Sequence, residues 1–267
     1  MLNLNILIQN ILDALTASVM PMEHTVDKLE YGDPYSKVEG IAVTFLASQE
    51  VIEKAKALGT NLIISHEGIF YSHWDKRDIL RMNPVYQKKC QTIEESKMAV
   101  YRFHDNIHNY TPDGIMKGLL QSLGWQNYEV ENQPEASIIV IPEVTLQDVI
   151  YHVKMCLGTK FIRFIGDTTM SCKRIGLLVG YRGGEELTIP LFEKQDVDLV
   201  IYGEGPEWET PEYVRDAIHQ GSQKALIVLG HAESEVPGMK YLTHWLQEKF
   251  PNIPVHFIPQ EPIFQIL

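Results

Sequence analysis

The chain has 267 residues, of which 45% are hydrophobic and 22% are charged, a composition that is typical of a folded globular protein and excludes collagen-like and low-complexity classes. Its 23 Lys and Arg residues stand against 35 Asp and Glu residues, and the formal net charge of -12 disfavours direct binding to nucleic acid phosphates. The length exceeds that of a typical single domain, so we expect two domains.

Cysteine usage and the N-terminal stretch bear on the compartment. Cys90, Cys156 and Cys172 are widely spaced and odd in number, which indicates neither a disulfide framework nor a thiolate zinc site. The first 20 residues have no basic region before their apolar stretch, and the apolar residues from Leu4 to Leu15 recur at helical spacing. We therefore predict an amphipathic first helix, a cytoplasmic protein and no membrane association.

Short apolar runs alternate with helical segments along the rest of the chain. A strand at 40–45, a helix at 48–59 and a strand at 60–66 open the pattern, which returns as a strand at 174–180, a helix at 186–195 and a strand at 196–203. Further strands are predicted at 98–103, 137–142, 224–230 and 255–258. This alternation is typical of an α/β protein.

The two halves of the chain share an internal repeat. In each half a buried strand ends in a Glu-Gly pair, ISHEG at 64–68 and IYGEG at 201–205. A later strand ends in His104 or His231, and another candidate ligand, His108 or Glu235, follows four residues on. The alternative is that the similarity of the two halves is a coincidence of ordinary α/β patterning. We predict a first half at 1–130, which C-terminal segments could complete, and a second half at 131–267, joined by a polar loop at 129–135.

The repeated residues are of the types that bind metal. Functional groups in α/β proteins gather beyond the carboxyl ends of strands, where all of these residues are expected. Imidazole and carboxylate ligands together suit two divalent transition-metal ions such as zinc, iron or manganese, and such a pair supports hydrolytic chemistry. The predicted metal ligands are His66, Glu67, His104, His108, His231 and Glu235, and Glu67 and Glu204 are the predicted catalytic carboxylates.

Several neighbouring residues have two interpretations. Ser65 and Ser234 lie outside any GxSxG motif, so each hydroxyl is interpreted as a hydrogen-bonding group and not as a nucleophile. The remaining histidines, His73 among them, lack the repeated arrangement and are interpreted as structural or surface residues. The aromatic stretch 71–74 is the expected place for substrate specificity. Trp208 could line a substrate pocket, but we favour packing for it.

The segments NLIISHEGIFY, YRFHDNIHN, LVIYGEGPEWETPEYVRDA and VLGHAESEVPGMKYL resemble the Nif-three-like family, also labelled type-two GTP cyclohydrolase I homologues, over nearly the whole chain. The resemblance implies two related α/β half-domains packed around a central metal-binding cleft with a dinuclear centre, no inserted middle domain here, and assembly into a hexameric ring. His231 and Glu235 match the family's GHxxxE motif. Glu67 stands where the family has a histidine, and His108 stands where it has an aspartate.

Two classes of function follow. The first is a metal-dependent hydrolase of a small-molecule substrate, with GTP cyclohydrolase-type activity implied only by the family name. The alternative is a non-catalytic metal-binding scaffold, a metal chaperone or a ring-forming interaction protein. In a third case, the exchanges at Glu67 and His108 would have destroyed the metal site.

Overall fold

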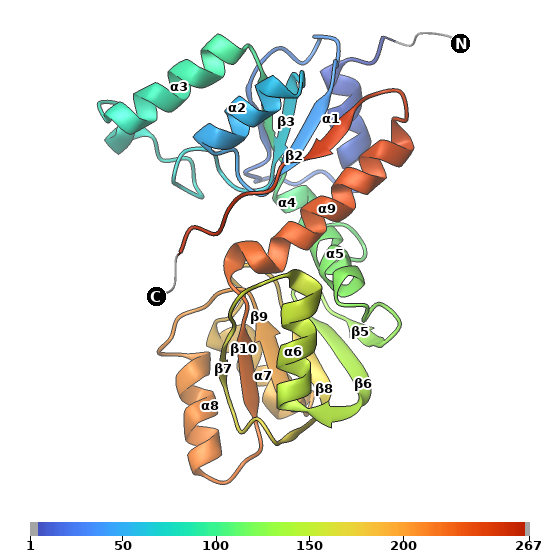
Figure 1. The fold of residues 1–267 in the computed structure, drawn as a ribbon, viewed down its shortest axis with the longest axis vertical. Helices are drawn as coiled ribbons and strands as arrows, with labels where there is room; N and C mark the ends of the chain where they lie inside the picture. Colours follow the sequence, from blue (N-terminus) through green and yellow to red (C-terminus); the bar gives the residue numbers. More distant parts are fainter. Residues whose placement is uncertain (1–4, 265–267) are drawn as a thin grey trace. The chain divides into compact units, whose positions relative to one another are not determined.

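The computed structural model describes residues 5–264, and the chain divides into two compact α/β units (Figure 1). Unit 1 comprises Met1–Thr111 together with Met239–Leu267, and unit 2 comprises Pro112–Gly238. The predicted α/β class with two α/β halves is confirmed. The units divide after residue 111, whereas the sequence repeat placed the join after residue 130, and the C-terminal segment belongs to unit 1.

Unit 1 is built on a five-stranded sheet in the order β1-β4-β3-β2-β11. Strands β2, β3, β4 and β11 are parallel, and β1 runs antiparallel along β4. Every residue of β2, β3 and β4 is buried, because helices cover both faces of such sheets and strands there need apolar side chains on both sides. The bounds are Lys28–Tyr31 for β1, Ile41–Thr44 for β2, Leu62–Ser65 for β3, Ala99–Arg102 for β4 and Val255–Phe257 for β11.

The helices of unit 1 begin where the local sequence supplies a cap. The Ser48 hydroxyl accepts the Val51 N–H at the start of α2 (Gln49–Ala57). The Asn83 side chain accepts the N–H groups of Val85 and Tyr86 at the start of α3 (Pro84–Ser96). The predicted amphipathic helix is confirmed as α1 (Ile8–Thr16), which buries four apolar residues; Leu4 lies outside the described residues. Two shorter elements, η1 (Asp78–Leu80) and α4 (Asp105–His108), complete the unit with part of α9.

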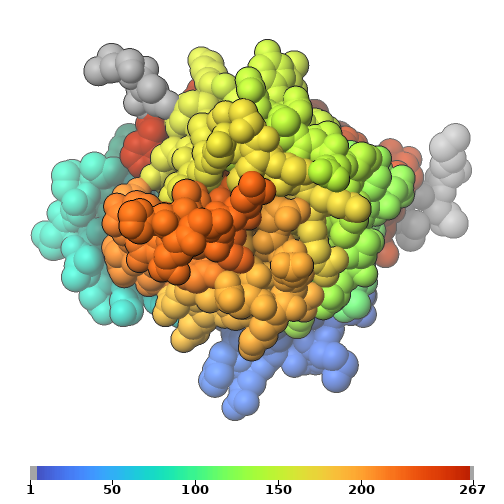
Figure 2. All heavy atoms as spheres, turned by 90° about the horizontal axis from the view of Figure 1, so that it is seen from below, coloured from blue at the N-terminus to red at the C-terminus, as the bar shows by residue number. Residues whose placement is uncertain are grey.

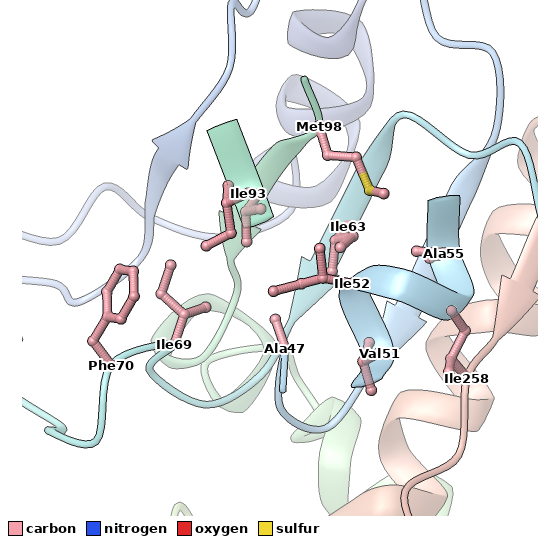
Figure 3. Packing of buried hydrophobic residues seen from close by; sticks show 12 residues of the cluster. Ala47, Val51, Ile52, Ala55, Ile63, Ile69, Phe70, Ile93, Met98 and Ile258 are labelled. Carbon is pink, nitrogen blue, oxygen red and sulfur yellow. The ribbon is translucent and has the colours of Figure 1, made fainter. Parts of the chain in front are cut away.

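Apolar side chains of α2, α3 and the sheet form one core of unit 1 (Figure 3). Ile52 of α2, Ile93 of α3 and Ile63 of β3 are each almost completely buried in this cluster. The core thus fixes β3 and β4, whose carboxyl ends carry the predicted ligands.

Unit 2 contains a six-stranded sheet in the order β5-β6-β8-β9-β10-β7. Its centre is parallel, β8 to β9 and β9 to β10, and the outer strands β5, β6 and β7 pair antiparallel with their neighbours. The bounds are Glu129–Asn132 for β5, Ser137–Thr145 for β6, Arg163–Ile165 for β7, Ser171–Leu177 for β8, Leu199–Tyr202 for β9 and Ala225–Val228 for β10.

Unit 2 contains the helices α5 (Gly114–Ser122), α6 (Leu146–Leu157), α7 (Glu185–Lys194) and α8 (Thr210–His219). Helix α8 and the loop after it lie on the face seen in Figure 2. The predicted polar loop at 129–135 is wrong in part, because residues 129–132 form β5 and only the turn to β6 is irregular. Trp125 stacks on His152 of α6 with ring centroids 5.4 Å apart. This ring contact links the segment after residue 111 to helix α6 of unit 2.

Helix α9 (His231–Lys249) begins at His231, so the HAESE segment forms its first turns. Gly118 of α5 lies against Gly238, where a Cβ on Gly118 would be 2.6 Å from the Pro237 carbonyl oxygen and 2.7 Å from the Gly238 nitrogen. Only glycine permits this approach of two backbones. Among residues 5–264, no helix combines the length and the apolar character needed to cross a membrane.

Candidate metal centre

The first ligand pair follows β3 directly. His66 is completely buried, and its ring Nδ1 lies 3.1 Å from the carbonyl oxygen of Phe103, after β4. Because a carbonyl oxygen can only accept, Nδ1 carries the hydrogen and the lone pair is on Nε2. Burial and tautomer are those of a histidine that binds metal through Nε2.

His104 and His108 belong to the short segment that follows β4. His104 is the residue before α4 and His108 is the last residue of that helix, so the single turn between them places both rings on one side. His104 Nδ1 lies 2.8 Å from Asp105 Oδ1, which again directs the lone pair to Nε2. Burial lowers the pKa of His104, although Asp105 opposes this effect, and the ring is therefore held in the neutral form that binds metal.

Asp27, just before β1, holds this segment in place. Its Oδ1 accepts the backbone N–H groups of His104 and Asp105 at 2.7 and 2.8 Å, and its Oδ2 accepts the backbone and side-chain N–H groups of Asn106. Burial raises the pKa of Asp105, but hydrogen bonds from His104, Val26 and Thr25 together lower it by more, so the pKa lies well below the usual range. Two carboxylates thus fix the backbone and the ring of His104.

Three imidazoles of unit 1 lie close together. Ligand nitrogens of His66, His104 and His108 all lie within 4.8 Å of one another, and the ring of His66 stacks on that of His104 with centroids 4.6 Å apart. Three imidazole nitrogen donors suit zinc or iron better than calcium or magnesium, which prefer oxygen. The donor set of the described residues is therefore compatible with the predicted class of metal.

Glu67 lies beside this cluster and is oriented by a buried arginine. Its Oε1 is 3.7 Å from His104 Nε2, and its Oε2 accepts the Gly68 N–H and lies 3.4 Å from Arg102 Nη2. Arg102 is 1% exposed and also binds His73. Ligand atoms of Glu67, His73 and His104 form a second group within 4.8 Å, so His73, which was interpreted as a structural or surface residue, adjoins the candidate site.

Unit 2 brings its own predicted residues together at the ends of β9 and β10. His231 Nε2 lies 3.1 Å from Glu235 Oε2, because the two residues are one turn apart at the start of α9. His231 Nδ1 lies 3.0 Å from Oε2 of Glu204, so this carboxylate accepts the ring hydrogen. Glu235 is 2% exposed, whereas the Glu204 side chain is 51% exposed.

Two small residues make room for this cluster. Gly180 has a φ of +58°, and a Cβ there would lie 3.0 Å from Glu235 Cδ and 3.3 Å from His231 Nε2. Ser234 accepts the Gly180 N–H at 2.9 Å and donates to the His231 carbonyl oxygen at 2.7 Å. The interpretation of the Ser234 hydroxyl as a hydrogen-bonding group is confirmed, and Ser65 likewise accepts the Ala47 N–H and donates to the Glu67 carbonyl.

A model of the Duf34/NIF3 (NGG1p interacting factor 3) family matches residues 12–262. The chain belongs to the Duf34/NIF3 family. It is 25% identical over 244 residues to the GTP cyclohydrolase 1 type 2 homolog of Chlamydia trachomatis, which covers 89% of this chain and 91% of that relative. The homolog of the same name from Clostridium perfringens is 24% identical over 229 residues, 83% of this chain and 82% of the relative.

Solved structures agree on the fold. The structure of a Bacillus cereus protein related to NIF3 is similar with a TM-score of 0.77 at 16% identity, over 97% of this chain and 98% of that one. A Staphylococcus aureus hypothetical protein is similar with a TM-score of 0.76 at 19% identity, over 98% of this chain and 99% of that one. The family model that matches residues 12–262 confirms the resemblance to the Nif-three-like family.

Several residues that shape the site in this Duf34/NIF3 chain were not predicted. Asp105 could have been found, because it stands inside the HDNIH motif, and Gly180 ends the apolar run at 174–180. Asp27 and Arg102 carry no such signal, since their partners come from other segments of the chain. Trp208 is 76% exposed, so the expectation that it packs into the core is wrong.

Proposed function

We propose that this Duf34/NIF3 protein binds divalent transition metal and uses it to hydrolyse a small metabolite. The observation that carries the proposal is the group of three imidazoles, His66, His104 and His108, whose nitrogens converge within 4.8 Å. His66 is completely buried, and hydrogen-bond acceptors face Nδ1 of His66 and His104, as is expected of histidines that bind metal through Nε2.

Six side chains make up the proposed ligand set, which is enough for two ions. His66, Glu67, His104 and His108 belong to unit 1, and His231 and Glu235 belong to unit 2. A divalent ion pair would supply Lewis acidity and activate a water molecule for attack. Zinc, iron and manganese are the candidates, and the mixed donor set favours none of them strongly.

Glu67 and Glu204 are the proposed acid and base groups. Arg102 and the Gly68 N–H hold one oxygen of Glu67, and its other oxygen is directed toward His104. The Glu204 side chain is half exposed, so it can exchange protons with solvent while it orients His231. These two positions give each unit one carboxylate for proton transfer.

The substrate is proposed only as a class. The name of the chlamydial and clostridial relatives makes GTP the first compound to test. The exposed side chains of Tyr71 and Trp74, in the loop after β3, support the expectation that this loop contacts the substrate.

Elemental analysis with a substrate panel tests the proposal. Protein purified after growth with zinc, iron and manganese should contain about two metal ions per chain, and it should hydrolyse GTP or other nucleotides and phosphoesters. His104→Ala should lose metal and activity, and the exposed His219 of α8 gives the matched control His219→Ala. Protein without stoichiometric metal would contradict the proposal, and metal without turnover would favour the non-catalytic scaffold.

We also propose that the protein forms a homo-oligomer, with the hexameric ring implied by the family as the specific expectation. Light scattering in solution measures the mass directly. A mass of about six chains supports the ring, and the mass of a single chain would contradict any oligomer.

A further inference from the structure

His73 has a different hydrogen-bonding environment from the proposed ligand histidines. It lies in the loop after β3, where its ring contacts Trp74 edge to face and His104 edge to face, with centroids 4.9 and 5.0 Å away. Its backbone carbonyl accepts Arg102 Nη1 at 2.6 Å, and its ring Nδ1 lies 3.2 Å from Arg102 Nη2. One guanidinium thus holds both the backbone and the ring.

The guanidinium determines which ring nitrogen of His73 carries the hydrogen. Arginine remains protonated and has five N–H donors and no acceptor. The nitrogen that faces it must accept, so the Nδ1 lone pair is used and the hydrogen is on Nε2. Arg102 is 1% exposed and contacts both Glu67 and His73, so its guanidinium is held between them.

The ligand histidines have the opposite arrangement. Nδ1 of His66 faces a carbonyl oxygen, and Nδ1 of His104 faces a carboxylate. Each of these two rings therefore has its lone pair on Nε2, where it can bind metal. His73 presents an N–H at Nε2 and is unsuited to be a ligand, although it lies in a group with Glu67 and His104.

We propose that His73 donates a hydrogen bond from Nε2 to an oxyanion, a phosphate or carboxylate oxygen, of a molecule bound at this site, and that Arg102 positions it for this role. The ring is exposed to solvent and adjoins Glu67 and His104, so a small molecule at the metal centre can reach it. A fixed N–H donor beside a cation centre is suited to a negatively charged oxygen. The inference rests on the proposed metal site for the location of the bound molecule.

The tautomer can be measured without metal or substrate. In metal-free protein with 15N-labelled histidine, two-bond 1H–15N correlation spectra should show a pyrrole-type Nε2 and a pyridine-type Nδ1 for His73, identified by the signals lost in His73→Gln. The reverse pattern, with the hydrogen on Nδ1, would overturn the inference. This result does not depend on whether the protein binds metal.

Binding of inorganic phosphate to zinc-loaded protein tests the donor role. Gln carries an amide N–H at a position similar to that of Nε2, so His73→Gln should keep phosphate affinity within about threefold, whereas His73→Leu should weaken it by about tenfold. Zinc content should stay unchanged in both variants. Loss of zinc in His73→Leu, equal phosphate affinity in all three proteins, or no phosphate binding by zinc-loaded wild type would each overturn the role. Absence of zinc from wild type would instead contradict the proposed function.

Discussion

Replacement of Gly180 by alanine tests how the unit 2 cluster is built. The residue has a φ of +58°, where an L side chain costs roughly 1 kcal/mol, and an added Cβ would lie 3.0 Å from Glu235 Cδ. Carbon atoms in contact are about 3.5 to 4.0 Å apart, so the carboxylate must move by roughly 1 Å. Because the Glu235 side chain is 2% exposed, this movement should disrupt its contact with His231.

Thermal unfolding and metal titration measure the two effects of Gly180→Ala separately. Gly158, after α6, is the matched control, since it has a φ of +67° and its added Cβ would meet nothing within 4 Å. Both variants should lower the melting temperature by about 2 to 4 °C from backbone strain alone. Only Gly180→Ala should also weaken metal binding, by at least about tenfold. Unchanged metal affinity in Gly180→Ala, or an equal loss in Gly158→Ala, would refute the reasoning.

Three further predictions concern single side chains. Asp27→Ala removes the acceptor of four hydrogen bonds from the segment at 104–106, and it should lower the free energy of unfolding by about 2 kcal/mol in urea titrations, with Asp27→Asn intermediate. Glu204→Gln should weaken metal binding roughly 10- to 100-fold by isothermal titration because it perturbs the Nδ1 partner of His231, and unchanged affinity would argue against that role. Burial lowers the pKa of Lys89 to about 8, so between pH 8 and about 10.4 the unfolded chain binds more protons than the folded protein does. The free energy of unfolding should therefore rise through this window by up to roughly 3 kcal/mol relative to Lys89→Met. Parallel pH curves for the two proteins would contradict this prediction.

The exchanges at Glu67 and His108 are accommodated locally. Arg102 is close enough to Glu67 to compensate its charge, and the short helix α4 carries His108 to within 5.1 Å of His66, measured between ring centroids. Nitrogens of His66, His104 and His108 converge within 4.8 Å. Metal analysis decides the third case considered from the sequence, a site destroyed by these exchanges.

The buried strands and their terminal residues were predictable from the sequence. Apolar runs such as that at 62–65 are long enough to identify parallel strands that are covered on both faces, and the polar residue that follows each run marks its carboxyl end. Strands β1, β5 and β7 were missed because they are short, largely exposed and without an apolar run, so pairing with a neighbour alone defines them.

The sequence by itself determined which residues could bind metal, because imidazole and carboxylate groups recur at the same distance from equivalent strand ends. Only the tertiary structure decided which nitrogen of each ring is available. That choice depends on acceptors and donors from segments far away in the chain, such as Phe103 for His66 and Arg102 for His73. Local spacing describes the ligand set, whereas the different roles of His66 and His73 follow from the partner that faces Nδ1 of each ring.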